Sequence, residues 1–311
     1  MTKKVKSTSR PSLDLGWGQQ STGPTYQLVD SGDFKRLEHI GGFLIERPAP
    51  AAVWSPSLAM ETWKGAQARF ERLSEGNGRW HFSGPDLKGK SFEVRLGSIP
   101  FVLRMTGFGH LGLFAEQEPN WRRLQEVLKQ PSFSSSAPAE VLNLFAYTGG
   151  STMACALAGA RVTHVDASKT SVDWARENAA RAGLAEAPIR WIVEDVQAFV
   201  ARELRRGRRY QGLILDPPSF GRGPKGQTWK IEEHLIPLLR DLAQLMDPER
   251  GFVLLSSHSP GYTPTALGNL LAQNFGGAGA ASQGQIQWAE EMLIHDQQGQ
   301  ALPSGASAWW L

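Results

Sequence analysis

Three acidic residues in the middle of the chain are placed where a ligand would bind. Asp166, Asp195 and Asp216 stand at the ends of short runs rich in valine, isoleucine and leucine. In an open parallel sheet the carboxyl ends of the strands meet at one edge, and ligands bind there. Carboxylates at that edge accept hydrogen bonds from ribose hydroxyls and amino groups. The spacing therefore predicts a site for a nucleotide-like ligand.

A glycine turn comes before these acidic residues in the chain. Thr148, Gly149 and Gly150 lie between an apolar run at residues 141–145 and an alanine-rich segment at 152–160. Glycines let a ligand approach the backbone closely, and a helix that begins there points free N–H groups at anionic atoms. The pattern G-x-G-x-x-G of nicotinamide enzymes is absent. The turn is either a cofactor loop or an ordinary tight turn.

The segment Asp216-Pro217-Pro218-Ser219-Phe220 indicates the chemistry most directly. The two prolines fix the backbone, so that carbonyl groups and the Asp216 carboxylate can accept hydrogens from an amino or imino group. Phe220 offers a ring on which a planar group can stack. We therefore interpret this segment as the place where a substrate nitrogen is held.

The elements that must position these residues alternate between strand and helix from about residue 139 onward. This order predicts an α/β fold with a doubly wound, Rossmann-like sheet of seven strands, whose last pair is antiparallel. The expected strands lie at residues 141–145, 161–166, 189–193, 211–215, 251–255, 285–293 and 307–311, and the expected helices at 152–160, 169–183, 197–206, 231–245 and 264–274.

Four short motifs together resemble a known family. They read Asn-Leu-Phe-Ala-Tyr-Thr-Gly-Gly, Val-Asp-Ala-Ser-Lys, Ala-Arg-Glu-Asn and Asp-Pro-Pro-Ser-Phe, and a Gly-Leu-Phe…Gln…Asn segment precedes them. This series is similar to the class I S-adenosylmethionine-dependent methyltransferases. Within that class it resembles the bacterial large-subunit (23S) ribosomal RNA methyltransferases that modify cytosine at C5 or guanine at N7. The resemblance covers roughly residues 107–311 and implies S-adenosyl-L-methionine as the cofactor and structured RNA, namely ribosomal RNA, as the substrate.

The resemblance also implies a role for each motif residue. Asp166 would bind the ribose hydroxyls, although an Asp here is also a common helix cap. Asp195 would accept the adenine amino hydrogens, unless Glu194 takes that place. His258 either orients the substrate or has a structural role. The implied cofactor-binding set is Tyr147, Thr148, Gly149, Gly150, Asp166, Ala167, Asp195 and Val196; the catalytic set is Asp216, Pro217, Pro218 and Phe220; the substrate-binding set is Arg222, Lys225 and His258.

Two departures from the cytosine-C5 enzymes bear on the chemistry. Those enzymes carry an N-terminal RNA-binding PUA domain, which nothing here clearly matches, and a catalytic cysteine after the fifth strand, where this chain has Ser256-Ser257-His258. C5 of a pyrimidine is a poor nucleophile that a thiolate usually activates. The single cysteine, Cys155, falls in the helix after the glycine turn and is expected in the core. Methylation at nitrogen or oxygen is therefore the better chemistry.

The N-terminal part has a different character. The sequence predicts a flexible basic tail at residues 1–24 and a small β-rich domain for substrate recognition at residues 25–130. A linker at residues 131–138 and the methyltransferase domain at residues 139–311 are predicted to follow. Residues 54–73 hold a segment that fits a helix, and residues 221–227 fit a Gly/Pro loop. The aromatic residues of the β-rich domain either stack on bases or fill its core; they are Trp54, Trp63, Trp80 and Phe82.

Composition bounds the remaining possibilities. The 311 residues are 41% hydrophobic and 20% charged, which is typical of a soluble protein of about two domains. With one cysteine, no long apolar run and no metal-ligand spacing of histidines, we expect a cytoplasmic protein without disulfide, membrane span or metal. The net charge of +3 is too small to indicate nucleic acid by itself.

Clustered arginines supply a second hint of a polyanionic partner. Arg202, Arg205, Arg206, Arg208 and Arg209 form one group, and Arg222, Lys225 and Lys230 surround the Asp-Pro-Pro loop. Either group binds phosphates or is simply solvated. Two other functions remain open: methylation of a protein or small molecule at nitrogen or oxygen, and cofactor binding without catalysis. The oligomeric state is open as well.

Overall fold

A seven-stranded sheet forms the centre of the computed structural model, which describes residues 25–74, 77–83, 87, 89–134, 137–223, 226–276 and 284–311. The predicted tail at 1–24 and Lys225 lie outside these residues. The strand order is β10-β9-β8-β11-β14-β16-β15, with β16 antiparallel to both of its neighbours. The strands are β8 (Glu140–Leu144), β9 (Arg161–Asp166), β10 (Ile189–Val193), β11 (Gly212–Leu215), β14 (Phe252–Ser257), β15 (Ile286–His295) and β16 (Ala301–Trp310). The predicted sheet, with its antiparallel last pair, is confirmed.

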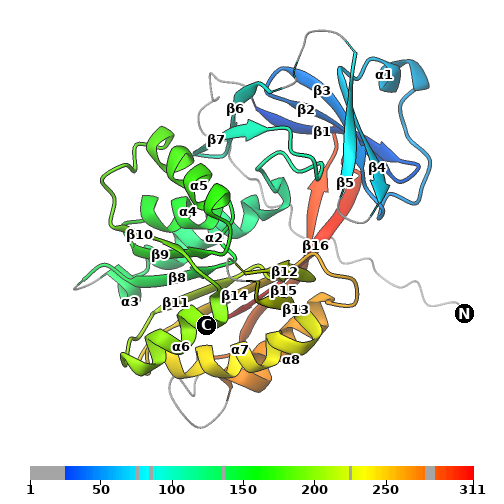
Figure 1. Cartoon of the computed structure of the whole chain (residues 1–311). Coiled ribbons are helices and arrows are strands. Elements are labelled where there is room, and N and C mark those ends of the chain that lie inside the picture. The colour runs from blue at the N-terminus through cyan, green and yellow to red at the C-terminus, as the bar shows by residue number, and fades with distance from the viewer. Residues whose placement is uncertain are drawn as a thin grey trace, which may run out of the picture.

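Helices cover both faces of this sheet, as Figure 1 shows. One face carries α2 (Glu118–Leu128), α4 (Gly150–Leu157) and α5 (Lys169–Arg181), and the other carries α6 (Val196–Arg205), α7 (Ile231–Leu245) and α8 (Pro264–Phe275). Side chains alternate between the faces along each strand. Val141 and Leu254 therefore belong to one buried core, and Leu142 and Val253 to the other.

The helix starts are set by local hydrogen bonds. Ser168, Asp195 and Thr263 are the N-caps of α5, α6 and α8, and each side chain accepts a bond from the backbone N–H three residues later. Such caps satisfy donors that a helix leaves free at its start. Two of them follow directly after β9 and β10, so the same turns that end the strands begin the helices at the ligand-binding edge.

The N-terminal part is a five-stranded sheet followed by a hairpin and a helix. The sheet runs β1-β2-β3-β4-β5, and the separate hairpin β6–β7 leads through the 3-10 helix η1 (Ala115–Gln117) into α2. The bounds are β1 (Tyr26–Gly32), β2 (Lys35–Ile40), β3 (Phe43–Pro48), α1 (Met60–Lys64), β4 (Ala68–Ser74), β5 (Asn77–Phe82), β6 (Ser91–Leu96) and β7 (Ile99–Arg104). The α/β class with a smaller β-rich region is confirmed.

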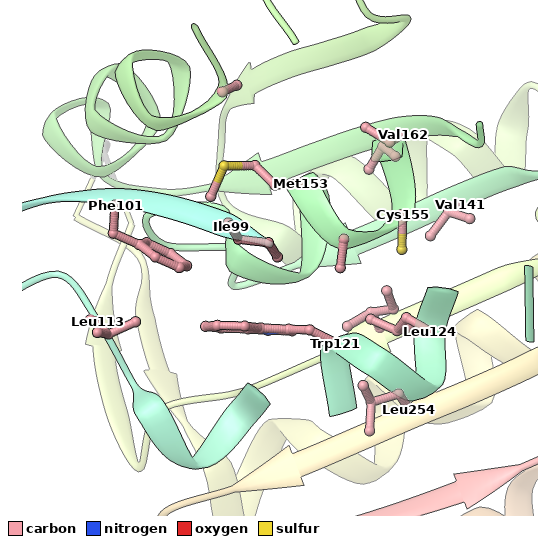
Figure 2. Close-up of a cluster of buried hydrophobic side chains, with 14 of the residues drawn as sticks. Ile99, Phe101, Leu113, Trp121, Leu124, Val141, Met153, Cys155, Val162 and Leu254 are labelled. Carbon is pink, nitrogen blue, oxygen red and sulfur yellow. The ribbon is translucent and has the colours of Figure 1, made fainter. Parts of the chain in front are cut away.

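Two interfaces tie this part to the large sheet. Leu28 of β1 packs with Ile294 and Leu302 from the far ends of β15 and β16. On the other side the hairpin lies against α5, where Trp174 donates to the Val102 carbonyl at 2.6 Å and Asn178 accepts from the Val102 N–H at 2.8 Å. In Figure 2 the Trp121 ring of α2 lies under Phe101 of β7 and beside Leu124 and Leu254. The two parts thus share one core.

Three segments show local structure beyond the expectations. The helical segment expected within residues 54–73 is α1, and β4 and β5 form a hairpin in which Phe70 packs on Trp80 at 5.1 Å between ring centroids. The loop expected at 221–227 is partly a hairpin of β12 (Phe220–Arg222) and β13 (Thr228–Lys230). The segment expected as a linker begins with the short helix α3 (Pro131–Ser134), whose Phe133 is buried against Phe252. Side chains distant in sequence contribute to the packing of two of these segments: Phe252 packs on Phe133, and Phe145 packs on Trp229.

The packing of α7 gives a direct stability test. Leu239 is 0% exposed, whereas Ile236 on the same helix is 39% exposed. Leu239→Ala removes buried atoms and leaves a cavity, so its free energy of unfolding should fall by about 2–5 kcal/mol. Ile236→Ala should change it by about 0.5 kcal/mol. Urea unfolding followed by tryptophan fluorescence measures both; equal losses would show that α7 does not pack as described.

Candidate active site

A cleft of about 470 Å³ opens at the carboxyl ends of β8, β9, β10 and β11. A smaller cavity of about 50 Å³ adjoins it and shares Tyr147 and Asp216 with it. Of the predicted residues, the cleft is lined by Tyr147, Asp166, Ala167, Asp195, Val196, Asp216, Pro217, Pro218, Arg222 and His258, and the smaller cavity by Thr148, Gly149 and Gly150. Residues from six separate segments of the sequence thus meet at one edge of the sheet.

Phe220 is the predicted residue that the structure does not bring to the cleft. It begins β12, its side chain is 55% exposed, and it is absent from the lining of both cavities. The aromatic side chain that does line the cleft from this hairpin is Trp229, which packs on Phe145 at 4.7 Å between centroids. Its indole N–H donates to the Pro218 carbonyl at 2.7 Å and so holds the diproline segment in place.

The glycine turn reflects packing inside the protein as well as the access that a ligand would need. Gly149 has φ 87°, a left-handed conformation that favours glycine, and it precedes the first turn of α4. A side chain at Gly150 would collide with the indole of Trp121. The space beside Gly150 is therefore filled by the protein itself, and only Gly149 has the backbone conformation expected of a ligand-binding turn.

Asp166 braces the same turn from the end of β9. Its Oδ2 accepts the Tyr147 N–H at 2.9 Å, and its Oδ1 accepts the Ser168 N–H at 2.8 Å. Burial raises the pKa of Asp166, while these two backbone bonds oppose the rise. An ionised carboxylate has about four acceptor positions. Two of them are taken, so Asp166 has acceptor positions left for hydroxyl groups in the cleft.

The structure separates the two acidic candidates at the end of β10. Asp195 lines the cleft and also accepts the Ala198 N–H at 3.0 Å as the cap of α6. Glu194 does not line the cleft; it forms an ion pair with Arg202. Of the two alternatives for the adenine-binding acceptor, the geometry favours Asp195.

A network of polar side chains lies at the tip of β11. Asp216 Oδ2 accepts from Gln117 Nε2 at 3.0 Å, and its Oδ1 faces His258 Nδ1 at 3.3 Å. The other ring nitrogen of His258, Nε2, lies 3.1 Å from Glu116 Oε1. The imidazole is therefore placed between two carboxylates, one from η1 and one from the end of β11.

These contacts set the charges of the network. Burial disfavours the imidazolium, but Asp216 and Glu116 outweigh it and raise the pKa of His258 well above its ordinary value. Burial would also raise the pKa of Asp216, but the charge of His258 and the bond from Gln117 hold it below its ordinary value. The pair is therefore ionised at neutral pH, with a positive His258 and a negative Asp216.

The amide of Gln117 is oriented by Asn120. Asn120 Nδ2 donates to Gln117 Oε1 at 2.8 Å, so the Gln117 NH₂ group faces Asp216 and Ser256. Asn120 Oδ1 in turn accepts from the Trp309 indole at 3.0 Å. The sequence assigned no role to Glu116 or Gln117, although the Gly-Leu-Phe…Gln…Asn segment contains Gln117 and Asn120. Their partners lie far away in the sequence, so the network itself left no sequence signal.

Other predicted features prove to be structural. Cys155 is 0% exposed, and burial raises the pKa of its thiol, so the expectation of a core cysteine is confirmed by its position. Trp54, Trp63 and Trp80 donate their indole N–H groups to Ser31, Asp30 and Thr106, and Phe82 packs against the core. Within the described part of the chain, no group of His, Cys, Asp and Glu residues is arranged to hold a metal, and no helix is long and apolar enough to cross a membrane.

The arginine group at the end of α6 is largely compensated by neighbouring acceptors. Arg202 pairs with Glu194, and Arg206 and Arg208 share the buried Glu203. Arg209 donates to the Gln244 carbonyl. At the cleft itself, Arg222 lines the wall, whereas Lys230 pairs with Glu233. Of these cations, Arg222 is the one that lines the cleft.

Sheet order and cleft together define the class of the protein: a doubly wound α/β enzyme whose ligand lies across the tips of the first four strands. Comparison with known proteins agrees. A family model described as S-adenosylmethionine-dependent methyltransferase matches residues 47–274. The crystal structure of a SAM-dependent methyltransferase from Agrobacterium tumefaciens is 34% identical, with a TM-score of 0.84, over 94% of this chain and 91% of that one. The chain belongs to the S-adenosylmethionine-dependent methyltransferase family, and S-adenosylmethionine is its cofactor.

More distant relatives add detail. SMU.776, described as a candidate methyltransferase and solved with SAH, is similar in fold, with a TM-score of 0.70 at 18% identity over 94% of this chain and 76% of that one. Ribosomal RNA large subunit methyltransferase K/L is 34% identical in Syntrophotalea carbinolica over 56% of this chain, and 29% identical in Alteromonas mediterranea over 80%. The chain spans 23% and 33% of the length of these two relatives.

Removing the Asp166 carboxylate tests the cofactor site. Asp166→Ala loses both the brace on the Tyr147 loop and the acceptors for ribose hydroxyls, so SAH affinity measured by titration calorimetry should fall by about 100-fold. Asp173→Ala is the matched control, because Asp173 lies exposed on α5 and pairs only with Lys169. Equal affinity of Asp166→Ala and Asp173→Ala would refute the assignment.

The network also predicts how stability depends on pH. Because the folded pKa of His258 is raised, its stabilising contribution is complete below the unfolded value of about 6.5 and is lost as pH rises toward the folded pKa. The free energy of unfolding of the wild type should therefore fall, relative to His258→Gln, as pH rises from about 6.5 into the alkaline range. Urea unfolding across this range gives the difference; a difference independent of pH would mean that His258 is not charged in the folded protein.

Proposed function

We propose that this chain transfers the methyl group of S-adenosylmethionine to a base of structured RNA, namely ribosomal RNA of the large subunit, and that it acts at nitrogen in the cytoplasm. The relatives named as ribosomal RNA large subunit methyltransferases support the substrate class. Arg222 at the cleft wall supports a substrate that carries phosphates. A base of folded RNA would have to leave its stack to reach the cleft.

The residues at the sheet edge fit the cofactor. Asp166 has acceptor positions for ribose hydroxyls, and Asp195 and Val196 line the cleft where an adenine would lie. Gly149 and Thr148 border the small cavity that adjoins Asp216, which suits the methionine end. When bound, S-adenosylmethionine supplies a methyl group on a positively charged sulfur, which a lone pair attacks directly.

One atom carries the proposal of nitrogen methylation. Asp216 Oδ1 is buried, and the structure places His258 Nδ1 3.3 Å from it as its ion-pair partner. A carboxylate oxygen can accept two hydrogen bonds, so Oδ1 has an acceptor position left for a ligand. An amino or imino N–H of a substrate base is a donor that suits this position. Bonding to Asp216 would hold the nitrogen in position and direct its lone pair toward the methyl group.

The charge of His258 completes this account. An imidazolium already holds its protons, so it cannot take the proton that the methylated nitrogen releases. Its effect is to keep Asp216 ionised before transfer, so that the carboxylate bonded to the N–H can accept this proton and pass it to water in the cleft. Carbon methylation would need a thiolate instead, and the single thiol, Cys155, is buried outside the cleft.

Labelled methyl transfer tests the proposal. RNA, protein and small-molecule fractions are prepared from cells that lack the gene, and each is incubated with the enzyme and tritiated S-adenosylmethionine. We expect label in large-subunit ribosomal RNA, carried by an N-methylated nucleoside in mass spectrometry. Asp216→Asn should keep SAH affinity but lower the transfer rate by about 100-fold or more.

The other outcomes identify the alternatives. Label in protein or in small molecules would replace RNA as the substrate, and 5-methylcytosine would overturn the assignment to nitrogen. Binding of SAH without transfer to any fraction would indicate a protein that binds the cofactor without catalysis.

A further inference from the structure

A second cavity, of about 190 Å³, lies between the N-terminal sheet and the loop that follows β7. We call it the cationic groove, and its defining residues are Arg36 of β2, Arg47 of β3, Arg72 of β4, Phe108 and His110. Phe114, His110 and His258 line both this groove and the cofactor cleft. The two cavities are therefore neighbours, separated by the side chains that they share.

Positive charge exceeds negative charge in the groove. Arg47 and Arg36 share one carboxylate, Glu38, at 2.7 Å and 3.5 Å. No ion pair joins Arg72 to a described residue, and the other acid at the groove, Glu116, already faces His258. The three guanidinium groups of the groove therefore have one carboxylate, that of Glu38, as an ion-pair partner. Guanidinium groups that are only partly compensated around a cavity favour the entry of an anion, and their planar geometry matches phosphate.

The pKa of His110 reflects the same excess of positive charge. Burial, and then the positive charges of Arg47, Arg36, Arg72 and His258, lower the pKa of His110 to about 4. The imidazole is therefore neutral at pH 7 and adds no charge of its own. All four cations at the groove lower the pKa of His110. This agrees with the excess of positive charge counted above.

The rim of the groove carries an exposed ring on an anchored loop. Phe108 is 60% exposed, although a large hydrophobic side chain is usually covered. Its neighbour Gly109 lies against the ring of Phe70, and the Gly109 carbonyl accepts from Arg47 at 3.2 Å. The loop is thus attached to the N-terminal sheet through the same arginine that lines the groove. An exposed aromatic ring beside a cationic wall is the arrangement that binds single-stranded nucleic acid.

We infer that the cationic groove binds the nucleotide next to the one that is methylated, with its phosphate on the arginines and its base against Phe108. A base that turns out of a folded RNA carries its neighbours toward the protein, and the groove adjoins the cleft that would receive that base. The inference rests on the proposed RNA substrate. It assigns substrate recognition in this chain to an identified surface of the N-terminal sheet.

Arg72 is the residue to change, because Arg36 and Arg47 are needed to pair with the buried Glu38. The matched control is Arg79 of β5, which is exposed and does not line the groove. Arg79 stands opposite Glu71 in the β4–β5 ladder, so its side chain lies on the other face of the sheet from that of Arg72. Methyl transfer is measured on deproteinised large-subunit ribosomal RNA from cells that lack the gene, at several salt concentrations between roughly 50 and 200 mM.

Arg72→Gln should raise KM for this RNA by about ten-fold with little change in kcat. It should also reduce the slope of log(kcat/KM) against log salt by about 0.7 to 0.9, which is the value of one phosphate contact. Phe108→Ala should raise KM similarly but leave the slope unchanged, because no charge is lost. Arg79→Gln should behave as the wild type, and all three variants should keep the SAH affinity of the wild type.

The failure of this inference differs from the failure of the proposed function. If the wild type methylates the RNA but Arg72→Gln matches Arg79→Gln in KM and slope, the groove is not a nucleotide site. The same conclusion follows if both arginine variants lose activity equally, because the effect is then one of overall charge. A wild-type enzyme that transfers no methyl group to RNA would overturn the RNA proposal and, with it, this assignment.

Discussion

The active-site edge depends on one imidazole held between two carboxylates. His258 comes from the loop after β14, Asp216 from the end of β11 and Glu116 from η1, so one side chain joins three segments. Without the positive charge, Glu116 and Asp216 would be two carboxylates on either side of a neutral ring, and like charges in one site destabilise each other. The imidazolium makes the arrangement stable and keeps Asp216 ionised.

This constraint explains why the N-terminal part is inseparable from the catalytic edge. Glu116 and Gln117 precede the large sheet in the chain, yet they complete the environment of Asp216. Asn120 extends the connection to Trp309 of β16, and Trp121 fills the space beside Gly150. Because the same segment continues from the loop that carries Phe108, the cleft and the cationic groove are positioned by one stretch of chain.

The sequence was informative where the physical cause is local. Apolar runs predicted all seven strands of the large sheet, and acidic residues and glycines at their ends predicted the members of the cleft, because strand tips in this fold meet at one edge. Contacts between distant segments were not predictable. Gln117 and Asp216 are 99 positions apart, and Glu116 and His258 are 142 apart. Nothing in a single sequence pairs them.

The same limit explains the individual errors. Phe220 follows the Asp-Pro-Pro motif directly, but the β12–β13 pairing brings Trp229 to the cleft instead. The visible arginine cluster at the end of α6 is compensated by Glu194 and Glu203. In contrast, Arg36, Arg47 and Arg72 are scattered over three strands and formed no sequence pattern. Charge clusters in sequence are poor guides to charge in space when the partners come from elsewhere in the fold.

The protonation state of His258 is the most direct measure of this account. Two-dimensional NMR of ¹⁵N-labelled protein, titrated between about pH 5 and 10, reports it, with the His258→Gln spectrum identifying the signal among the seven histidines. The account predicts an imidazolium that persists well above pH 7 in the wild type and a lower pKa in Asp216→Asn. An imidazole that titrates near its ordinary value of about 6.5, unchanged in Asp216→Asn, would contradict it.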